Sequence, residues 1–214
     1  MATIIPGILT NDEDDYVKRL RRAEHVANLI QIDVIDGQFA PNTTIGPEVI
    51  QRHPTSSMLE VQLIVKKPKI YIKKLIDLDF VSRIIFPFES DEIVEENIYL
   101  IKSNKKQVGL SINPETPISG VLGLMDDIDL LCIFSATPGF SGKKLEEPVY
   151  DRIKESKKIN AALPVEIDIG VNFETAHKLA KAGANFLIAT SALHNAADFN
   201  LAYEKLAKLA KTDG

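Results

Sequence analysis

Two aspartates, Asp33 and Asp168, follow the short apolar runs Asn28–Ile32 and Leu163–Ile167, and each precedes a loop that contains glycine. A carboxylate that ends a buried parallel strand lies at the face of an α/β protein where active sites are built. Two such acids that converge from opposite walls are typical of an acid/base pair acting on both faces of one carbon atom. Taken singly, each aspartate could equally be structural, accepting hydrogen bonds from backbone N–H groups.

The elements that must position these acids alternate along the chain. Short β-branched runs and amphipathic, charged segments follow one another at intervals of about 25 residues. The expected strands are Thr3–Leu9, Asn28–Asp33, Met58–Val65, Val81–Phe86, Gln107–Ile112, Ile128–Ser135, Pro164–Asp168 and Asn185–Ala189. The expected helices lie near 12–25, 46–53, 69–77, 91–103, 117–125, 146–160, 172–182 and 198–211. We expect Asn11, Asp91, Asn172 and Asp198 to cap helices, and Gly183 to end one.

The expected strands are apolar on both faces, as parallel strands covered by helices should be. Eight strand–helix units in 214 residues predict an α/β fold, a (β/α)8 barrel of the ribulose-phosphate-binding type, as a single domain over residues 1–214. A doubly wound parallel sheet is the alternative. It is disfavoured because no Gly-x-Gly-x-x-Gly turn follows the first strand.

Three loops after neighbouring strands are rich in groups that bind anions. In the segment Thr137–Lys143, two glycines flank a hydroxyl group and a lysine follows, so backbone N–H groups can approach an anion closely. Barrel enzymes often bind phosphate at the loops after strands seven and eight. We therefore expect a phosphorylated small molecule as substrate, although Gly-Phe-Ser-Gly alone could be a tight turn. The expected phosphate-binding residues are Gly139, Phe140, Ser141, Gly142, Gly170, Thr190 and Ser191.

Composition narrows the class of protein. The formal net charge of −5 disfavours binding to nucleic acid, which requires a basic face. The single cysteine, Cys132, excludes an intrachain disulfide and lies in an apolar run, as expected of a core residue. No apolar stretch approaches the length of a membrane span, and the N-terminus lacks the pattern of a signal peptide. We expect a cytoplasmic protein that binds neither nucleic acid nor membrane.

Several segments in the same order resemble the ribulose-phosphate 3-epimerase family over essentially the whole chain. Pro6-Gly7-Ile8-Leu9 resembles the family's Pro-Ser-Ile-Leu, and Gln31-Ile32-Asp33-Val34-Ile35-Asp36-Gly37 resembles its His-Val-Asp-Val-Met-Asp-Gly. Glu60-Val61-Gln62-Leu63 stands where the family has Asp-Val-His-Leu, and Asn113-Pro114-Glu115-Thr116-Pro117 matches Asn-Pro-x-Thr-Pro. Pro138-Gly139-Phe140-Ser141-Gly142 resembles Pro-Gly-Phe-Gly-Gly, Glu166-Ile167-Asp168-Ile169-Gly170-Val171 resembles Glu-Val-Asp-Gly-Gly-Val, and Ala189-Thr190-Ser191-Ala192 resembles Ala-Gly-Ser-Ala.

The resemblance implies an isomerase that epimerises a keto-pentose phosphate through an enediolate. Asp33 and Asp168 match the two family aspartates that remove and return the proton. The family's divalent metal lies between these acids and is completed by two histidines, which are Gln31 and Gln62 here. The resemblance also implies a homo-oligomer.

The two glutamines change the expected metal chemistry. Zinc prefers nitrogen and thiolate ligands, so zinc is not expected at Gln31, Asp33, Gln62 and Asp168. An all-oxygen set could weakly hold a hard cation such as Mg²⁺, Mn²⁺ or Ca²⁺. Alternatively, no metal binds, and the amides turn their NH₂ groups inward to donate hydrogen bonds to the enediolate.

Other positions expected to face the substrate also depart from the family. Gly7 replaces a serine and removes a hydroxyl group, while Ile35, Ile64 and Phe134 replace methionines. Ile169 and Thr190 replace glycines in the phosphate region. The leading hypothesis is an epimerase acting on a phosphorylated keto-sugar. A catalytically silent protein that binds a phosphorylated metabolite is the second, and another barrel reaction, such as decarboxylation or aldol chemistry, is the third.

Overall fold

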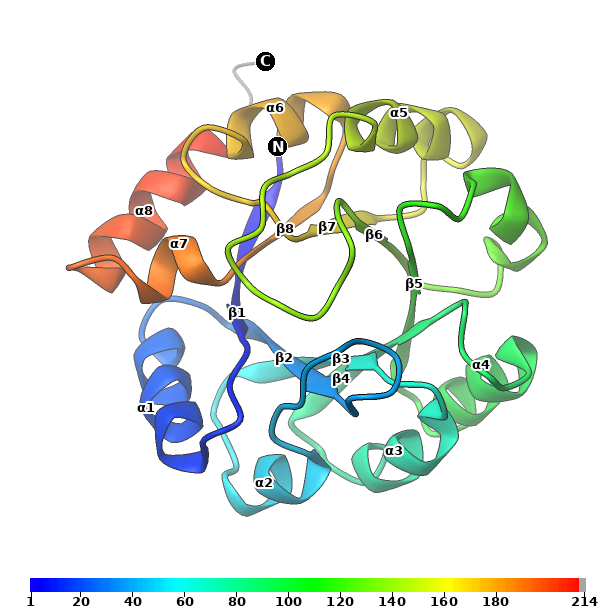
Figure 1. The fold of residues 1–214 in the computed structure, drawn as a ribbon, viewed down its shortest axis with the longest axis horizontal. Helices are drawn as coiled ribbons and strands as arrows, with labels where there is room; N and C mark the ends of the chain where they lie inside the picture. Colours follow the sequence, from blue (N-terminus) through cyan, green and yellow to red (C-terminus); the bar gives the residue numbers. More distant parts are fainter. Residues whose placement is uncertain (212–214) are drawn as a thin grey trace.

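Residues 1–211, which the computed structural model describes, form a closed parallel barrel in which β8 pairs back with β1 (Figure 1). The strands are β1 (Thr3–Ile8), β2 (Leu29–Ile35), β3 (Met58–Ile64), β4 (Val81–Pro87), β5 (Gln107–Ile112), β6 (Leu130–Phe134), β7 (Val165–Asp168) and β8 (Phe186–Ala189). The helices are α1 (Glu13–Glu24), α2 (Pro47–Arg52), α3 (Pro68–Leu75), α4 (Val94–Ser103), the 3₁₀ helix η1 (Ile118–Leu124), α5 (Val149–Ile159), α6 (Ala176–Ala182), α7 (Ser191–His194) and α8 (Phe199–Leu209). The predicted (β/α)8 barrel is confirmed. The doubly wound sheet is excluded because such a sheet has two open edges.

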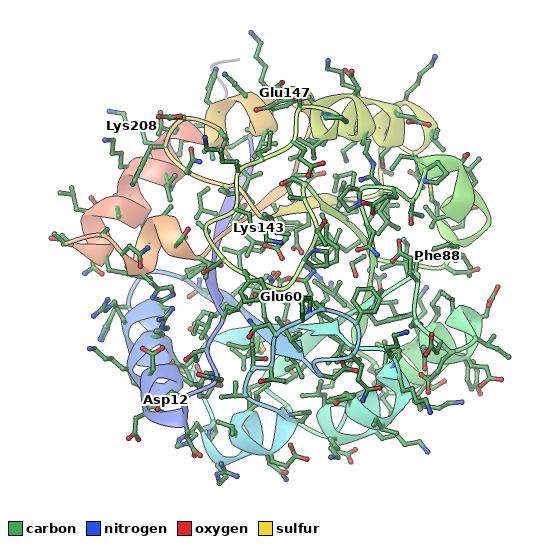
Figure 2. All side chains as sticks on the ribbon, in the orientation of Figure 1. Asp12, Glu60, Phe88, Lys143, Glu147 and Lys208 are labelled. Atoms are coloured by element: carbon green, nitrogen blue, oxygen red, sulfur yellow. The ribbon has the colours of Figure 1, made fainter. Side chains whose placement is uncertain are left out.

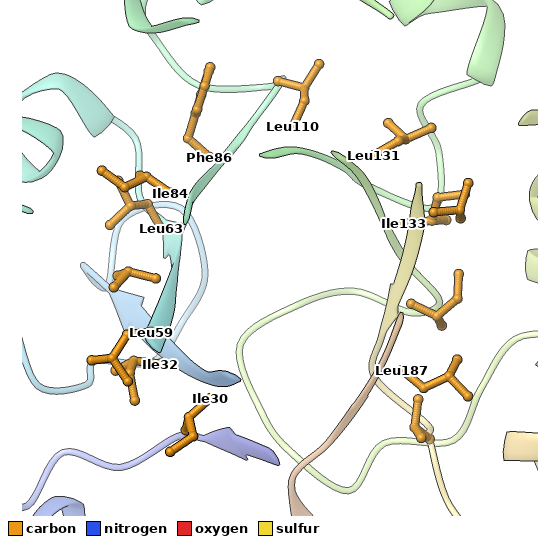
Figure 3. Close-up of a cluster of buried hydrophobic side chains, with 14 of the residues drawn as sticks. Ile30, Ile32, Leu59, Leu63, Ile84, Phe86, Leu110, Leu131, Ile133 and Leu187 are labelled. Carbon is orange, nitrogen blue, oxygen red and sulfur yellow. The ribbon is translucent and has the colours of Figure 1, made fainter. Parts of the chain in front are cut away.

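The hydrophobic core lies between the ring of strands and the surrounding helices. Side chains alternate between the two faces of a strand, and Figure 3 shows Ile30, Ile32 and Leu59 on the outer side of the ring. The intervening residues point into the barrel, and several of them are polar, including the buried Gln31 and Glu60. Figure 2 labels Glu60 inside the ring of strands. The expectation that the strands are apolar on both faces is therefore wrong for β2, β3 and β7. Their inner faces carry the buried polar groups described below.

Two helices begin at an aspartate whose side chain accepts a hydrogen bond from the first turn, and one of these caps lies one residue from the expected position. Asp12, one residue after Asn11, caps α1 by accepting a hydrogen bond of 2.7 Å from the backbone N–H of Asp15. Asp198 caps α8 as predicted, accepting from the backbone N–H of Leu201 at 3.0 Å. Gly183 ends α6 as predicted, in the left-handed conformation with φ 117° that favours glycine.

Two expected caps and one expected helix differ in the structure. The N-cap of α4 is Ile93 rather than Asp91. Asn172 accepts a hydrogen bond of 2.8 Å from the backbone N–H of Glu174, which forms a turn before α6 begins at Ala176. The segment near 117–125 is the 3₁₀ helix η1, whose sequence contains two glycines, and glycine is a poor former of α-helix. Within residues 1–211, no helix combines the length and the apolar character required to cross a bilayer.

Loops at the carboxyl ends of the strands meet over the barrel. In Figure 1 the segment between β6 and α5 crosses the opening of the ring. The side-chain amide of Asn42, in the loop after β2, donates a hydrogen bond of 2.6 Å to the carbonyl oxygen of Gly139 in that segment. Asp36 ties the loop after β2 to the end of β3 by accepting from the backbone N–H of Lys66 at 2.9 Å. The loops after β2, β3 and β6 therefore form one connected rim.

Candidate active site

Asp33 and Asp168 line the same cavity at the carboxyl ends of the strands. Asp33 lies on β2 and is 3% exposed, and Asp168 is the last residue of β7 and is 7% exposed. Thr44 supports the backbone at Asp33 by donating its hydroxyl to the Asp33 carbonyl oxygen at 2.6 Å. The Asp168 carboxylate accepts a hydrogen bond of 2.7 Å from the backbone N–H of Ile169. The fold thus brings two acids that lie far apart in sequence to one hollow.

The surroundings of the two acids favour their protonated forms. Burial, followed by the nearby charge of Asp168, raises the pKa of Asp33 well above its usual range, and the hydrogen bond from Gln31 opposes this shift. Burial also raises the pKa of Asp168 to about 7, against the opposing hydrogen bond from the Ile169 backbone. Two coupled acids in a poorly solvated site resist losing both protons. The pair therefore keeps a proton to higher pH than two free aspartates do, so it can supply an acid as well as a base.

The two glutamines lie beneath the acids rather than in the cavity wall. The Gln31 side-chain nitrogen donates to the Asp33 carboxylate at 2.9 Å and to the Gln62 side-chain oxygen at 2.7 Å. The Gln62 nitrogen in turn donates to the sulfur of Cys132 at 3.4 Å. Gln31, Gln62 and Cys132 are fully buried, and Asp33 is 3% exposed. The amides therefore hydrogen-bond one another and Asp33, and this arrangement differs from the expected donation to an enediolate.

The donor set does not fit zinc, and a hard divalent cation would meet an N–H group of Gln31 in the present orientation. Within residues 1–211, no group of three or more His, Cys, Asp or Glu side chains is placed to hold a metal ion. An N–H group of Gln31 points to the oxygens of both Asp33 and Gln62, and a polar hydrogen in that place repels a cation. Two carboxylates and two neutral amides also lack the nitrogen and sulfur ligands that zinc prefers.

The three loops predicted to bind phosphate come together at the cavity. Its lining includes every residue of that prediction: Gly139, Phe140, Ser141, Gly142, Gly170, Thr190 and Ser191. Gly139, Gly142 and Gly170 have φ values of 120°, 79° and 73°, so this rim requires a conformation that favours glycine. Lys143 does not line the cavity, because its ammonium group donates to the carbonyl oxygen of Thr137 at 2.8 Å.

The other residues expected to face substrate divide into two groups. Ile64 lines the cavity, as does Ile169 of the phosphate region. Leu9 and Ile188 also line it, and the sequence alone did not indicate them as substrate-facing. Gly7, Gln31, Gln62, Ile35 and Phe134 are not part of the lining. Ile35 and Phe134 pack against Ile64 in a small apolar cluster beneath the opening. Strand periodicity could have identified Leu9, because it lies two residues after the inward-facing Gly7.

A pair of replacements on neighbouring strands is sterically complementary. A Cβ atom at Gly7 would lie 2.4 Å from the hydroxyl oxygen of Thr190 and 2.8 Å from a methyl group of Ile188. Thr190 therefore occupies the space that a side chain at position 7 would need. The hydroxyl group expected to be missing because of Gly7 has a counterpart here, supplied from the end of β8.

This packing predicts that Gly7→Ser is harmful alone and tolerated with Thr190→Gly. Overpacking should lower the free energy of unfolding of the single variant Gly7→Ser by about 1–3 kcal/mol. In a double-mutant cycle measured by urea unfolding, the Thr190→Gly change should recover about 1 kcal/mol or more of that loss. Additive effects of the two substitutions would contradict the steric pairing.

Ile169 has a strained backbone at the cavity wall. Its φ of 74° is rare for a β-branched residue and has an expected cost of about 1–2 kcal/mol. Two contacts hold it there: its N–H donates to the carboxylate of Asp168, and its carbonyl oxygen accepts from the Ser135 hydroxyl at 2.8 Å. In this strained conformation, the N–H group of Ile169 holds one carboxylate oxygen of Asp168 in place.

Comparisons with known proteins agree with this architecture. The family model "Ribulose-phosphate 3 epimerase family" matches residues 3–194. The chain is 35% identical to ribulose-phosphate 3-epimerase of Bacillus subtilis, covering 92% of this chain and 94% of that protein. It is 30% identical to the Escherichia coli protein of the same name, covering 97% and 96% of the two chains.

Solved structures with low sequence identity share the fold. The 3-hexulose-6-phosphate synthase of Salmonella typhimurium has a TM-score of 0.73 at 15% identity and covers 97% of this chain and 98% of its own. Orotidine 5'-phosphate decarboxylase of Pyrococcus horikoshii has a TM-score of 0.69 at 13% identity, covering 97% and 99% of the two chains. The distant barrels thus share only the fold, whereas the family model and the relatives at 30–35% identity also match in sequence. The chain belongs to the ribulose-phosphate 3-epimerase family.

Proposed function

We propose that this protein is an isomerase that epimerises a phosphorylated keto-sugar. The observation that carries the proposal is that Asp33 and Asp168 line the same cavity as the three glycine- and hydroxyl-rich loops. Family membership and the names of the relatives support a carbohydrate phosphate as the substrate class. The phosphate would bind at the rim formed by residues 139–142, 170 and 190–191, with the sugar between the acids.

The proposed chemistry is proton transfer through an enediolate. The ionised member of the pair removes the proton next to the carbonyl group, and the protonated member delivers one to the opposite face. With one proton shared between Asp33 and Asp168, each direction of the reaction starts with one acid and one base. The hydrogen bond from the Gln31 side-chain nitrogen stabilises the anionic form of Asp33.

We further propose that no divalent metal takes part, because the donor set does not fit one. A weakly held Mg²⁺, Mn²⁺ or Ca²⁺ would require the Gln31 amide to turn its oxygen toward Asp33 and Gln62. Elemental analysis of natively purified protein tests this directly. Stoichiometric zinc, or activity that depends on any added divalent ion, would contradict it.

Solvent exchange tests the proposed function. Ribulose 5-phosphate incubated with the protein in D₂O should gain deuterium at C3 and form the C3 epimer. The same reaction is run with keto-hexose phosphates, and with and without Mg²⁺ and Mn²⁺. Absence of deuterium in every substrate would reject the epimerase.

A catalytically silent phosphometabolite-binding protein is the second candidate. One observation favours it: both N–H groups of Gln31 and one of Gln62 are used inside the protein, and neither amide lines the cavity. An enediolate would then lack two of the donors that could stabilise its charge. Phosphate-dependent binding without deuterium exchange would favour this candidate.

A single domain over residues 1–214, a cytoplasmic location and self-association remain predictions.

The buried acids should make the folded protein less stable as the pH rises from about 4 to 7. The raised pKa of Asp168, about 7, means that the folded state keeps a proton that the unfolded chain has already lost. Stability therefore falls by about 1.4 kcal/mol per pH unit for each acid that stays protonated. Urea unfolding at several pH values should show this slope, and Asp168→Asn should reduce it. An unchanged slope in that variant would contradict the raised pKa.

A further inference from the structure

A chain of buried polar side chains continues downward from the acid pair into the barrel. Its members Gln31, Gln62 and Cys132 are fully buried and come from β2, β3 and β6. They are joined in one direction, since Gln31 donates to Gln62 at 2.7 Å and Gln62 donates to Cys132 at 3.4 Å. None of them lines the cavity. Their contribution to the site must therefore be made through the acid pair, because Gln31 donates to Asp33 and its hydrogen bonding also lowers the pKa of Asp168.

The orientation of the Gln31 amide decides what Asp33 contacts. The two ends of a carboxamide are similar in size, but one end only donates and the other only accepts. With its nitrogen toward Asp33, Gln31 stabilises the carboxylate. When Asp33 is ionised, the oxygen end of Gln31 would place two acceptors face to face in a poorly solvated site, which is unfavourable.

Gln62 selects between these two orientations. Because the oxygen of Gln62 faces Gln31, only the nitrogen end of Gln31 can satisfy it. A reversed Gln62 would present its NH₂ group and would favour the oxygen end of Gln31 instead. The orientation of Gln31 thus depends on which end of the Gln62 amide is held by the neighbour of Gln62 that lies away from Gln31.

Cys132 contacts the nitrogen end of Gln62, and the groups around Cys132 leave its sulfur as a hydrogen-bond acceptor. A thiol can donate or accept. Glu166 is the register partner of Cys132 on β7, and both of its carboxyl oxygens are buried without another hydrogen-bond partner, so one of them can accept a hydrogen bond from the thiol. Arg83 keeps this acidic cluster in place, 2.6 Å from Glu60 and 3.9 Å from Glu166. The sulfur lone pairs are then left for the Gln62 NH₂ group.

We propose that Cys132 is a positioning residue which, through Gln62, holds the Gln31 amide with its nitrogen toward Asp33. Its kinetic consequence rests on the proposed epimerase activity. The amide orientation itself is a property of the protein without substrate. The two parts can therefore be tested separately.

The test compares Cys132→Val with Cys132→Ser. Valine removes the acceptor at similar size, whereas serine keeps both an acceptor and a donor. Ile85→Val is the matched control, because Ile85 is the register partner of Gln62 and packs against Cys132 without a polar group. The side-chain NH₂ signals of Gln31 and Gln62 are followed by ¹H–¹⁵N NMR in the substrate-free protein, together with their exchange in D₂O. The kcat and KM values for epimerisation of ribulose 5-phosphate are measured in parallel.

In Cys132→Val, the NH₂ signals of both glutamines should shift and lose protection from exchange, while Cys132→Ser should keep the wild-type pattern. The kcat value of Cys132→Val should fall about tenfold to a hundredfold with unchanged KM, and serine should restore it. Wild-type NMR signals in Cys132→Val, or the same loss of kcat in Ile85→Val, would overturn the proposal. If the valine variant does not fold, Cys132→Ala provides the same comparison. If the wild type turns over no sugar phosphate, the proposed function fails, and the amide signals still decide this inference.

Discussion

Asp33→Asn and Asp168→Asn should each lower the rate of epimerisation about 10²–10⁴-fold, the usual contribution of a general acid or base. The two acids line the cavity from different walls, so each variant keeps a functional group on only one face of the substrate. Each should therefore exchange deuterium into at most one of the two epimers, and the two variants should differ in which epimer that is. NMR of both epimers in D₂O measures this directly.

Binding and a remote aspartate provide the controls for this prediction. Both variants should still bind inorganic phosphate, because neither side chain belongs to the glycine-rich rim. Asp129→Asn is the matched change at the opposite end of the barrel, where Asp129 accepts a hydrogen bond of 2.8 Å from the Val108 backbone. It should leave the rate unchanged. Wild-type turnover in Asp33→Asn, or loss of the same proton in both active-site variants, would reject the assignment of the two acids.

Gly170→Ala should raise the KM for a phosphorylated substrate about tenfold or more, because displacement of a binding loop disturbs the geometry of the site. Gly170 has φ 73°, and a Cβ atom there would lie 2.7 Å from both the backbone nitrogen and the Cβ of Leu145. A clash with backbone cannot be relieved by a side-chain rotation. The segment after β6, which contains Leu145, must therefore move away from β7. The free energy of unfolding should also fall by about 1 kcal/mol or more.

Gly123→Ala provides the matched control for this change. A Cβ atom at Gly123 would meet nothing within 4 Å. This variant should keep the wild-type KM and close to the wild-type stability. Steady-state kinetics and urea unfolding of the two variants provide the comparison. An unchanged KM in Gly170→Ala would show that the contact between these loops does not shape the phosphate site.

The order of strands and helices could be predicted from the chain because it depends on local patterns. Apolar runs, charged amphipathic segments and the cap at Asp198 are short-range signals, and they place all eight strands within a few residues. Boundaries such as those at Asp91 and Asn172 were misplaced because several polar residues there compete to form a cap or a turn. Only the fold selects among such neighbours.

The identities of Asp33, Asp168, Gln31 and Gln62 predict an acid pair and an altered metal position, and the roles of these residues stay predictions. Their contacts were not predictable from the sequence. Whether an amide faces the cavity or a neighbouring side chain depends on groups from other strands, such as Cys132 on β6. Thr190 fills the space that a side chain at position 7 would occupy. This is likewise visible only when β1 and β8 lie side by side.

By itself, the amino-acid sequence determined the class of fold, the family motifs and the residues able to transfer a proton. These depend on residue type and on spacing along one segment, which the chain carries directly. The tertiary structure decided that the acids share one cavity, that the glutamines lie beneath it and that the inner faces of β2, β3 and β7 are polar. Those properties arise from closure of the barrel, which places residues from distant strands within hydrogen-bond distance and removes them from water.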